Sequence, residues 1–296
     1  MVLRDCVSAW ITRRELILAP STISGYRRLL RLYIEPSPAG ALELEKLDED
    51  DMLELLRPLI TAGHTRQAQL LQILVSAVLK DATRRRLVVC NVMDYVEKVR
   101  HKGRFTAWLC VEDARRFLGA NRGTDWYLAW LLMVCCGLRR GEVLGLRWDD
   151  VDFQRATLRV ERQLVRVDRK LMVTRTKSEA SSREIPVDDR ILSEMRLFRR
   201  PGRCIIEGGT PEAMAAALDA AIQRAGVPRV TPHGLRHTMA ATAAGAGVPM
   251  KVLQTLLGHA HMSTTADIYA HVAQDSRRSA AATITGAAFP TRLEIA

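Results

Sequence analysis

The chain has 296 residues, 48% of them hydrophobic and 26% charged, a composition that excludes a disordered protein and allows two domains with cores of their own. The formal net charge of +11 favours a polyanionic partner, most simply nucleic acid. Residues 101–296 carry most of that surplus, with 29 Lys and Arg against 20 Asp and Glu.

Residues 1–99 are predicted to form a small helical bundle. Apolar side chains recur at helical spacing in three stretches: 21–34, 52–60 and 65–86. Ser21 is the expected N-cap of the first, and Asn91 is expected to cap a further short helix over 92–99. The basic, glycine-containing stretch 100–104 is typical of a linker between two domains.

The second domain, 105–275, is predicted to be α+β, mainly helical with a small antiparallel sheet. Helices are expected near 111–118, over the apolar run 126–136, and again from about residue 188 onward. Alternating β-branched residues predict three strands, over 157–167, 170–176 and 182–187. A turn between the last two strands places Lys177 at a hairpin tip, and residues 276–296 follow the domain as a tail.

Neither a membrane segment nor a metal-binding cysteine pattern is visible. The apolar run 126–136 is too short to cross a bilayer, and the first residues have no signal-peptide pattern. The six cysteines include no C-x-x-C pair, so we expect reduced thiols in a cytoplasmic protein. Cys135 and Cys136 are expected to pack as small hydrophobic side chains.

One acidic cluster, formed by Asp149, Asp150 and Asp152, has the residue types that a two-metal nuclease uses. The alternative interpretation, a polar turn before the first strand, is favoured. An enzyme acting on phosphodiesters would then rely on cationic side chains.

Such cations lie at a predicted helix start. Thr231 is a good N-cap and Pro232 suits the first helical position. His233 and Arg236 then share one face of the first turn, where free N–H groups and the helix dipole favour phosphate. On spacing alone, a phosphate site and a pair of ordinary surface side chains are equally favoured.

Three further positions are ambiguous when each is taken by itself. Arg139 follows Gly137, which can end the buried helix, and is best explained as a solvated charge on a turn. Lys177 is a weak signal, because lysine is common at hairpin tips. Tyr269 lies in "HMSTTADIYAHV", ten residues after His259, and a packing aromatic is the better interpretation of it alone.

Together and in this order, these segments resemble the tyrosine recombinase (phage integrase) family. Four pieces match: "GLRRGE" from Gly137, "TKS" around Lys177, "HGLRH" from His233, and "LLGH" followed ten residues later by Tyr269. The resemblance covers most of 105–275, whereas 1–99 is similar only in layout to the family's core-binding domain. Gly141 stands where serine is more usual, and we expect little effect from this departure.

The resemblance implies four residues that act on or near the scissile phosphate. Arg139 and Arg236 would bind its non-bridging oxygens. His259 occupies the position where the family bonds the phosphate with His or Trp. Glu142 matches an acidic position that supports the first arginine and the histidine. Two permanently charged, forked guanidiniums suit the negative charge that develops at phosphorus.

The resemblance also implies the groups that attack and transfer protons. Tyr269 would be the nucleophile and form a 3′-phosphotyrosyl link, with His233 assisting proton transfer and Lys177 protonating the leaving 5′ oxygen. A phenol needs such help, because its ordinary pKa is about 10. No metal or cofactor is expected. No role falls on four neighbouring residues: Arg140, His237, His261 and His271.

The resemblance therefore implies a site-specific DNA recombinase of a phage or mobile element, acting through a Holliday junction without metal or ATP. The expected partners are double-stranded DNA with inverted core half-sites, further copies of the chain in a tetramer on that DNA, and an accessory directionality factor, with no membrane. A nucleoid-associated location follows. Little sequence precedes the bundle, so an arm-binding domain is expected to be absent.

Two alternatives stay open. The same tyrosine chemistry without strand exchange would give a type IB topoisomerase, and loss of the chemistry would leave a DNA-binding protein of the same fold. The tail, 276–296, is expected to pack on a neighbouring protomer or to be a disordered end.

Overall fold

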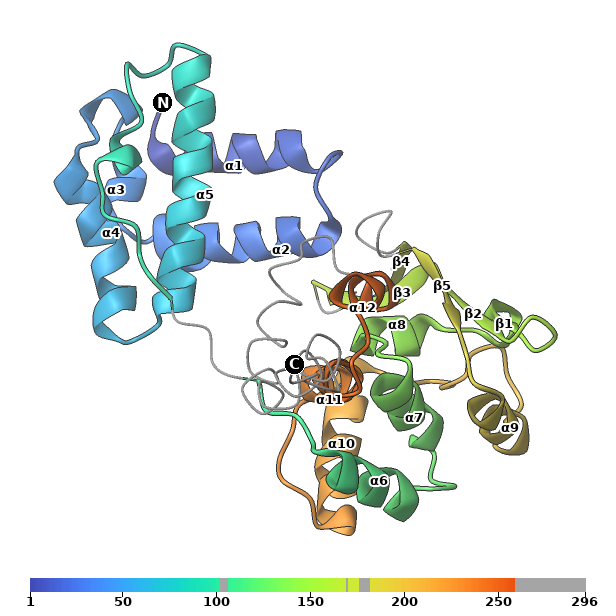
Figure 1. Cartoon of the computed structure of the whole chain (residues 1–296). Coiled ribbons are helices and arrows are strands. Elements are labelled where there is room, and N and C mark those ends of the chain that lie inside the picture. The colour runs from blue at the N-terminus through green and yellow to red at the C-terminus, as the bar shows by residue number, and fades with distance from the viewer. Residues whose placement is uncertain (102–105, 169, 176–181, 259–296) are drawn as a thin grey trace, which may run out of the picture. The chain divides into compact units, whose positions relative to one another are not determined.

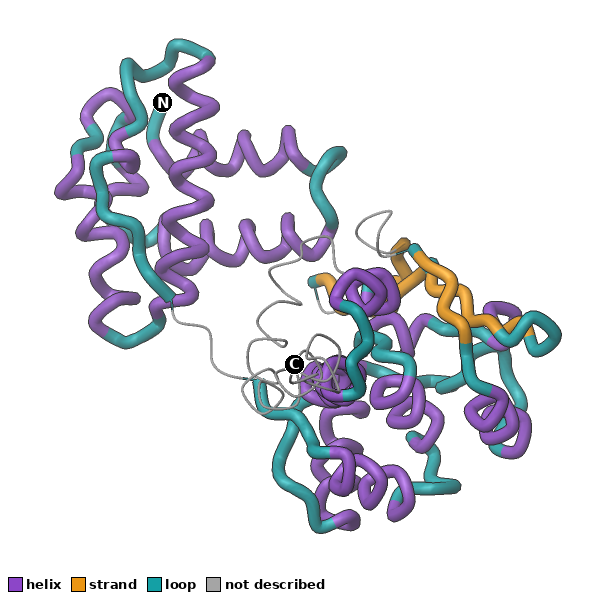
Figure 2. Tube along the Cα trace, viewed as in Figure 1, coloured by secondary structure: helices purple, strands orange, loops and turns teal. Residues whose placement is uncertain are grey.

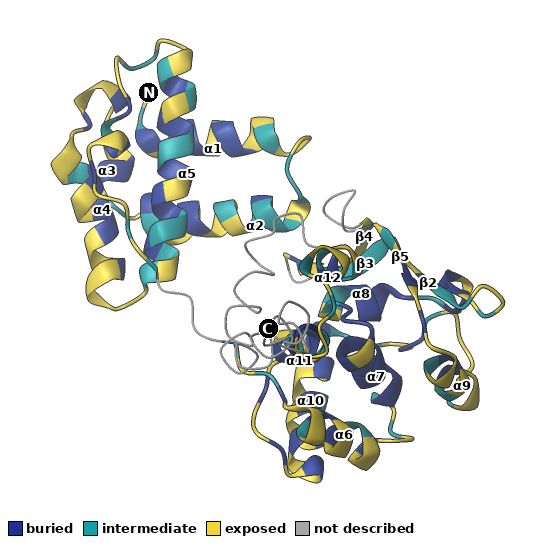
Figure 3. Cartoon of the chain, viewed as in Figure 1, coloured by how far each residue is buried: buried dark blue, intermediate teal, exposed yellow. Residues whose placement is uncertain are grey.

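The computed structural model describes residues 1–101, 106–168, 170–175 and 182–258. The chain divides into two compact units, one of Met1–Arg104 with Val167–Lys170 and the other of Phe105–Arg166 with Leu171–Ala296. Each unit has a hydrophobic core of its own, formed by the buried faces of its helices (Figure 3).

The first unit is helical. Its helices are α1 (Leu3–Arg14), α2 (Pro20–Leu29), α3 (Pro38–Ala41), α4 (Glu49–Thr61) and α5 (Thr65–Arg84), with short turns η1 (Leu30–Ile34), η2 (Leu44–Lys46) and η3 (Val92–Asp94) (Figure 1). The long helix α5 packs against both α1 and α4. Asp48 caps α4 through reciprocal hydrogen bonds with Asp51, which satisfy two N–H groups at the helix start.

Two local predictions are wrong in this unit. Helix α2 begins at Pro20 and not after Ser21, because the fixed φ of proline and its missing N–H suit the first helical position. Asn91 caps only the single turn η3. The chain beyond that turn is not helical, and the carbonyl of Glu97 accepts a hydrogen bond from the side chain of Gln72 at 3.0 Å.

The second unit is built around one apolar helix, α7 (Tyr127–Cys135), of which every residue up to Val134 is buried (Figure 3). Its other helical elements are α6 (Val111–Ala120), α8 (Arg140–Gly145), η4 (Trp148–Asp150), α9 (Asp189–Leu197), α10 (Pro211–Ala225), α11 (Pro232–Gly245) and α12 (Met250–Leu257). Helices α6, α8, α9 and α11 all contact α7. Cys136 packs in the core as predicted, but Cys135 is exposed at the end of α7.

In the described residues, five short strands form two separate sheets. Figure 2 shows the strands in orange. The strands are β1 (Val151–Asp152), β2 (Thr157–Val160), β3 (Arg162–Val167), β4 (Lys170–Arg175) and β5 (Arg183–Pro186). The first sheet is antiparallel in the order β1-β2-β5, and the second pairs β3 with β4. The predicted strand 157–167 is thus two strands, β2 and β3, which are separated at Glu161 and belong to different sheets.

This strand order differs from the hairpin predicted between the last two strands. In the described residues β5 pairs with β2 and β4 pairs with β3, so β4 and β5 do not form a hairpin. Lys177 itself lies within 176–181, outside the described residues.

Helix α8 packs closely on β3 through two glycines. A Cβ atom on Gly141 would lie 2.9 Å from the carbonyl oxygen of Leu164, and one on Gly145 would lie 3.0 Å from Cα of Gln163. These neighbours are backbone atoms, which cannot rotate aside. The expectation that glycine in place of serine at position 141 has little effect is therefore wrong, because this close packing needs a residue without a side chain.

No helix in the described part of the chain is both long and apolar enough to cross a membrane.

Candidate active site

The turn between α7 and α8 places Arg139 and Glu142 side by side. Gly137 takes a left-handed conformation with φ of 65°, which lets the chain leave α7. Arg139 then stands at the N-cap of α8 and Glu142 at the third helical position. The backbone N–H of Arg139 donates to Glu142 Oε2 at 2.9 Å, and its Nη1 donates to Oε1 at 2.7 Å. The Glu142 side chain is 1% exposed.

Helix α11 brings Arg236 to the same carboxylate. Thr231 caps the helix by accepting the N–H of Gly234, and Pro232 lies in the first turn, as predicted. The side chain of Arg236 is 2% exposed, and its Nη1 lies 4.0 Å from Glu142 Oε2. Arg236 also donates to the carbonyl oxygens of Gly137 and Leu257, each at 2.6 Å.

A third arginine, Arg183, was missed by sequence reasoning. It begins β5, and its Nη1 and Nη2 donate to the two oxygens of Glu142 at 3.1 and 3.0 Å. Its Nε donates to the carbonyl oxygen of Leu256 at 2.8 Å. The only local signal was a basic residue at the start of a predicted strand, whose partners lie far away in sequence.

The three arginines also meet three successive carbonyl groups at the end of α12. Arg183 bonds Leu256 and Arg236 bonds Leu257, while Arg139 Nη2 donates to the carbonyl oxygen of Gly258 at 2.8 Å. The last carbonyls of a helix have no partner within it and form the negative end of its dipole. The arginines supply these partners, and Gly258, with φ of 63°, ends the helix.

The cluster carries more positive than negative charge. Burial by itself would raise the pKa of Glu142, but the hydrogen bonds and charge of Arg183, followed by those of Arg139, hold that pKa below its ordinary value. Burial, followed by the charge of Arg139, lowers the pKa of Arg236 to about 9. At pH 7 three guanidinium groups therefore face one carboxylate, which is the electrostatic arrangement of an anion site.

His233 lies one turn before Arg236, and its ring contacts that of His237. The ring centroids are 4.4 Å apart in an edge-to-face arrangement. Partial burial, followed by His237, Arg236 and Arg139, lowers the pKa of His233 to about 4. His233 is thus a neutral imidazole at pH 7. His237, for which no role was predicted, is a direct neighbour that influences it.

The remaining predicted site residues, Lys177, His259 and Tyr269, lie outside the described residues, as do His261 and His271. The structure therefore brings together Arg139, Glu142, His233 and Arg236, and adds Arg183. Arg140 is exposed at the start of α8.

The acidic cluster forms the polar turn that was favoured for it. Asp150 accepts Arg162 Nη1 at 2.6 and 2.8 Å and the backbone N–H of Arg147 at 2.8 Å. Asp152 accepts the N–H groups of Gln154 and Arg155 in the turn before β2. In the described residues, no group of three or more His, Cys, Asp and Glu side chains has a metal-binding arrangement.

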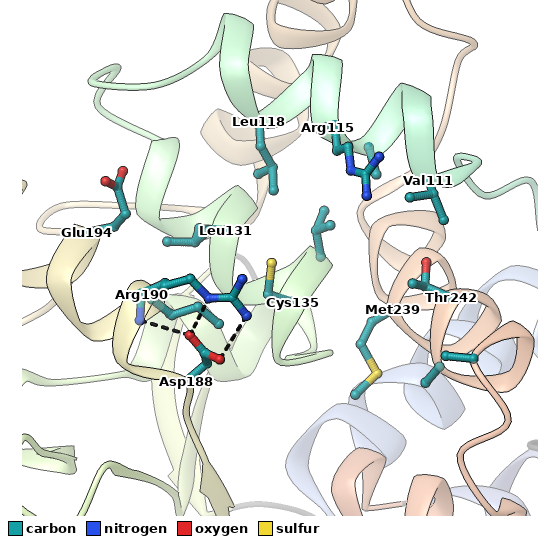
Figure 4. Close-up of a pocket in the computed structure, with 15 residues that line it drawn as sticks. Val111, Arg115, Leu118, Leu131, Cys135, Asp188, Arg190, Glu194, Met239 and Thr242 are labelled. Carbon is teal, nitrogen blue, oxygen red and sulfur yellow. Dashed lines mark hydrogen bonds and ion pairs between the residues drawn. The ribbon is translucent and has the colours of Figure 1, made fainter.

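A separate apolar pocket of about 550 Å³ lies among α6, α7, α9 and α11 (Figure 4). Cys135 and Met239 line it, and the exposed ion pair of Arg190 with Asp188 stands at one side. None of the described site residues lines this pocket.

Known proteins resemble this chain in sequence. A tyrosine recombinase XerC-like protein of Caldanaerobacter subterraneus is 31% identical over 205 residues, which cover 58% of this chain and 52% of the relative. A tyrosine recombinase of Thermosipho africanus is 25% identical over 271 residues, covering 87% and 90%. The chain thus spans about half the length of the first relative and most of the second.

Solved structures share the fold. A Tn1549 transposon integrase in complex with a circular intermediate DNA has a TM-score of 0.79 at 21% identity, covering 96% of this chain and 99% of that one. A lambda integrase dimer bound to a core site has a TM-score of 0.70 at 18% identity, covering 91% and 95%. These similarities confirm the predicted fold class. Residues 108–276, more than half of the chain, match the Phage integrase family, and the chain belongs to that family.

Proposed function

We propose that the protein is a site-specific DNA recombinase that cleaves and rejoins duplex DNA through a covalent tyrosine intermediate. The observation that carries this proposal is the cluster of Arg139, Arg183 and Arg236 around the single carboxylate of Glu142. A surplus of fixed positive charge, most of it buried, suits a phosphate better than an ordinary surface patch does. Membership of the phage integrase family supports the same activity.

Arg139 presents the accessible part of this charge. Its side chain is 32% exposed, against 6% for Arg183 and 2% for Arg236. Arg139 binds a non-bridging oxygen of the scissile phosphate. Arg236, which is nearly buried, offers the phosphate the N–H groups that do not bond Gly137 and Leu257. His259 adds a further hydrogen bond to the phosphate.

Tyr269 then attacks phosphorus. Its proton passes to His233, whose pKa of about 4 leaves it neutral and able to accept a hydrogen bond at pH 7. The bond from phosphorus to the 5′ oxygen breaks as Lys177 protonates that oxygen, which leaves a 3′-phosphotyrosyl link. A 5′ hydroxyl of another strand reverses these steps and displaces the tyrosine, so no external energy source is needed.

The proposed partner is double-stranded DNA with inverted core half-sites. The solved relatives include integrases bound to DNA and a lambda integrase tetramer bound to a Holliday junction. By analogy, 1–99 and 105–275 each bind DNA, 100–104 joins them, and four copies assemble on two sites. The same proposal includes an accessory factor that sets the direction of recombination and an association with the nucleoid. It also includes packing of the tail 276–296 on a neighbouring copy.

The relatives favour recombination over topoisomerase activity. Their names are those of tyrosine recombinases, a transposase from transposon Tn916 and a prophage integrase. The complete set of matched residue types likewise argues against a silent DNA-binding protein.

A covalent-adduct assay tests the proposal. The full chain is incubated with nicked suicide duplexes made from the DNA that flanks its gene, with and without EDTA, and the products are resolved under denaturing conditions. We expect a protein–DNA adduct in both conditions that is absent from Tyr269→Phe. The exposed tyrosine Tyr95 gives the matched control, since Tyr95→Phe should keep the adduct.

Three outcomes would count against it. No adduct on any duplex would favour a binding protein. An adduct on every sequence, with relaxation of supercoils and no strand exchange, would favour a topoisomerase. Loss of the adduct in EDTA would contradict catalysis by side-chain cations alone.

A further inference from the structure

Arg183 is held in the cluster by the register of the first sheet. Strands β2 and β5 pair so that Val160 lies opposite Arg183 and Leu158 opposite Ile185. Side chains two residues apart on a strand point to the same face, and Ile185 is buried. The strand therefore aims Arg183 into the unit, where 6% of its side chain is exposed.

Its contacts complete the hydrogen bonding of Glu142. A carboxylate can accept about four hydrogen bonds. Glu142 receives two from the fork of Arg183 and two from Arg139, one of them from the backbone. The charge of Glu142 is thus shared by two guanidiniums, and Arg183 provides the paired, bidentate contact that is the stronger geometry.

This sharing matters for Arg139 and Arg236. Without Arg183, the cations that the described residues offer to the buried carboxylate would be these two guanidiniums, at 2.7 and 4.0 Å. Their charge would then be drawn toward Glu142 and away from an anionic ligand. The carbonyl of Leu256 would also lose its donor at the end of α12.

We propose that Arg183 is a positioning residue for the active site: it neutralises Glu142, so that Arg139 and Arg236 serve the phosphate, and it fixes the end of α12 directly before His259. The identity of the ligand as the scissile phosphate rests on the proposed function. The arrangement of Arg183, Glu142 and α12 does not.

The chain offers a matched control in a second buried pair. Arg162 of β3 bonds Asp150, whose side chain is 2% exposed, and within the described part of the chain no second arginine side chain pairs with that carboxylate. Arg162→Met breaks a buried arginine–carboxylate contact in the same unit without touching the cluster. A loss shared by Arg162→Met and Arg183→Met reports on folding alone.

The test compares wild type, Arg183→Met, Arg183→Lys and Arg162→Met as full chains. The first measurement is the cleavage rate on a suicide duplex at increasing DNA concentration. For Arg183→Met we expect a maximum rate about 100-fold lower, with half-saturating DNA changed less than about 3-fold, because DNA contacts persist while the reacting groups shift. Arg183→Lys should recover about 10-fold of this loss, since lysine restores the charge but not the fork.

The second measurement does not depend on activity. Hydrogen exchange of the peptide over α12 should be about 10-fold faster in Arg183→Met than in wild type, because a charge-assisted bond to its last turn is gone. Arg162→Met should leave this peptide unchanged and keep the cleavage rate within about 3-fold.

The two measurements separate the two proposals. If wild type forms no adduct on any duplex while α12 loosens in Arg183→Met, the recombinase function fails and the positioning of α12 stands. If Arg183→Met and Arg162→Met give the same rates and the same exchange, Arg183 is an ordinary structural arginine and the inference is overturned. Should Arg183→Met fail to fold, Arg183→Lys decides: cleavage and α12 exchange as in wild type would equally overturn it.

Discussion

The described part of the second unit contains two buried carboxylates, Glu142 and Asp150, that share a local structure but differ in the charges around them. Glu142 and Asp150 are 1% and 2% exposed, and each accepts the backbone N–H of the residue three positions before it. Each also bonds an arginine from a strand, Arg183 for Glu142 and Arg162 for Asp150. The same capping motif thus occurs twice within one short stretch of chain.

The difference lies in what surrounds each pair. Among the described residues, the carboxylate of Asp150 bonds one arginine side chain, that of Arg162, and Glu161 lies 3.8 Å from that guanidinium. Glu142 has Arg139 and Arg236 in addition to its strand arginine, so positive charge is in excess there. Burial and a capping motif are common to both places, and only the surplus of guanidinium groups marks one of them as an anion site.

Removing the charge of one carboxylate at a time should give the largest difference in the free energy of unfolding between the two pairs. Glu142→Gln leaves three guanidiniums without a negative partner, two of them nearly buried, and we expect the free energy of unfolding to fall by about 3–5 kcal/mol. Asp150→Asn should cost only about 1–2 kcal/mol, because Arg162 is more exposed and can reach water. Urea denaturation at pH 7 measures both, and equal losses would contradict the charge argument.

The turn that leads into the cluster should show the next largest effect. Gly137→Ala puts a side chain on a residue with φ of 65° and places its Cβ 2.8 Å from Leu257 Cδ2. We expect a loss of about 2–3 kcal/mol from strain and overpacking. Gly226 is the matched control, since it has φ of 61° and a Cβ atom there would meet no other atom within 4 Å, so Gly226→Ala should cost about 1 kcal/mol.

Thermal or urea unfolding of the two glycine variants separates conformation from packing. If both lose the same amount, the contact of Gly137 with α12 has no energetic weight. The cluster would then be held by the arginines alone.

What could be predicted from the sequence follows the range of each interaction. The cap at Thr231, the end of α7 at Gly137 and the nearness of Arg139 to Glu142 are all local, and the structure contains them. A continuous run of apolar residues likewise sufficed to predict the buried helix α7. Such features depend on residues within about one turn of each other.

Interactions between segments that are distant in sequence were not predicted. Arg183 lies 41 positions from Glu142 and 73 from Leu256, and no pattern around it indicates either partner. The division of 157–167 into two sheets is also a matter of which strands meet. Non-local pairing of this kind is decided by packing and by register, which a single sequence does not encode in any short window.

The packing of α8 on β3 gives a smaller test near the cluster. Gly141→Ser would bring a side chain within 2.9 Å of a backbone carbonyl, so we expect a loss of about 1–3 kcal/mol. Gly119 lies in α6 with nothing within 4 Å, and Gly119→Ser should be neutral or slightly stabilising. Similar values for both variants, measured by urea denaturation, would show that α8 can move away from β3 at no cost.

The last test concerns His233, whose pKa depends on its burial and on the charges around it. Its folded pKa of about 4 lies below the ordinary value of 6.5, so the unfolded chain takes up a proton first as the pH falls. The stability contributed by neutral His233 is therefore complete above pH 6.5 and is lost between about pH 6.5 and 4. His233→Gln should lose less stability than wild type over that window.

An NMR titration of the imidazole C–H signals measures the same quantity directly. His233 should titrate near pH 4, and His237→Gln should raise its pKa, because His237 is the largest charged influence on it after burial. Inorganic phosphate at millimolar concentration should raise the pKa further if it binds beside Arg139 and Arg236, since a nearby anion favours the imidazolium. A His233 pKa of 6.5 or above in the free protein would mean that burial and the neighbouring charges of His237, Arg236 and Arg139 do not act on it as the structure indicates.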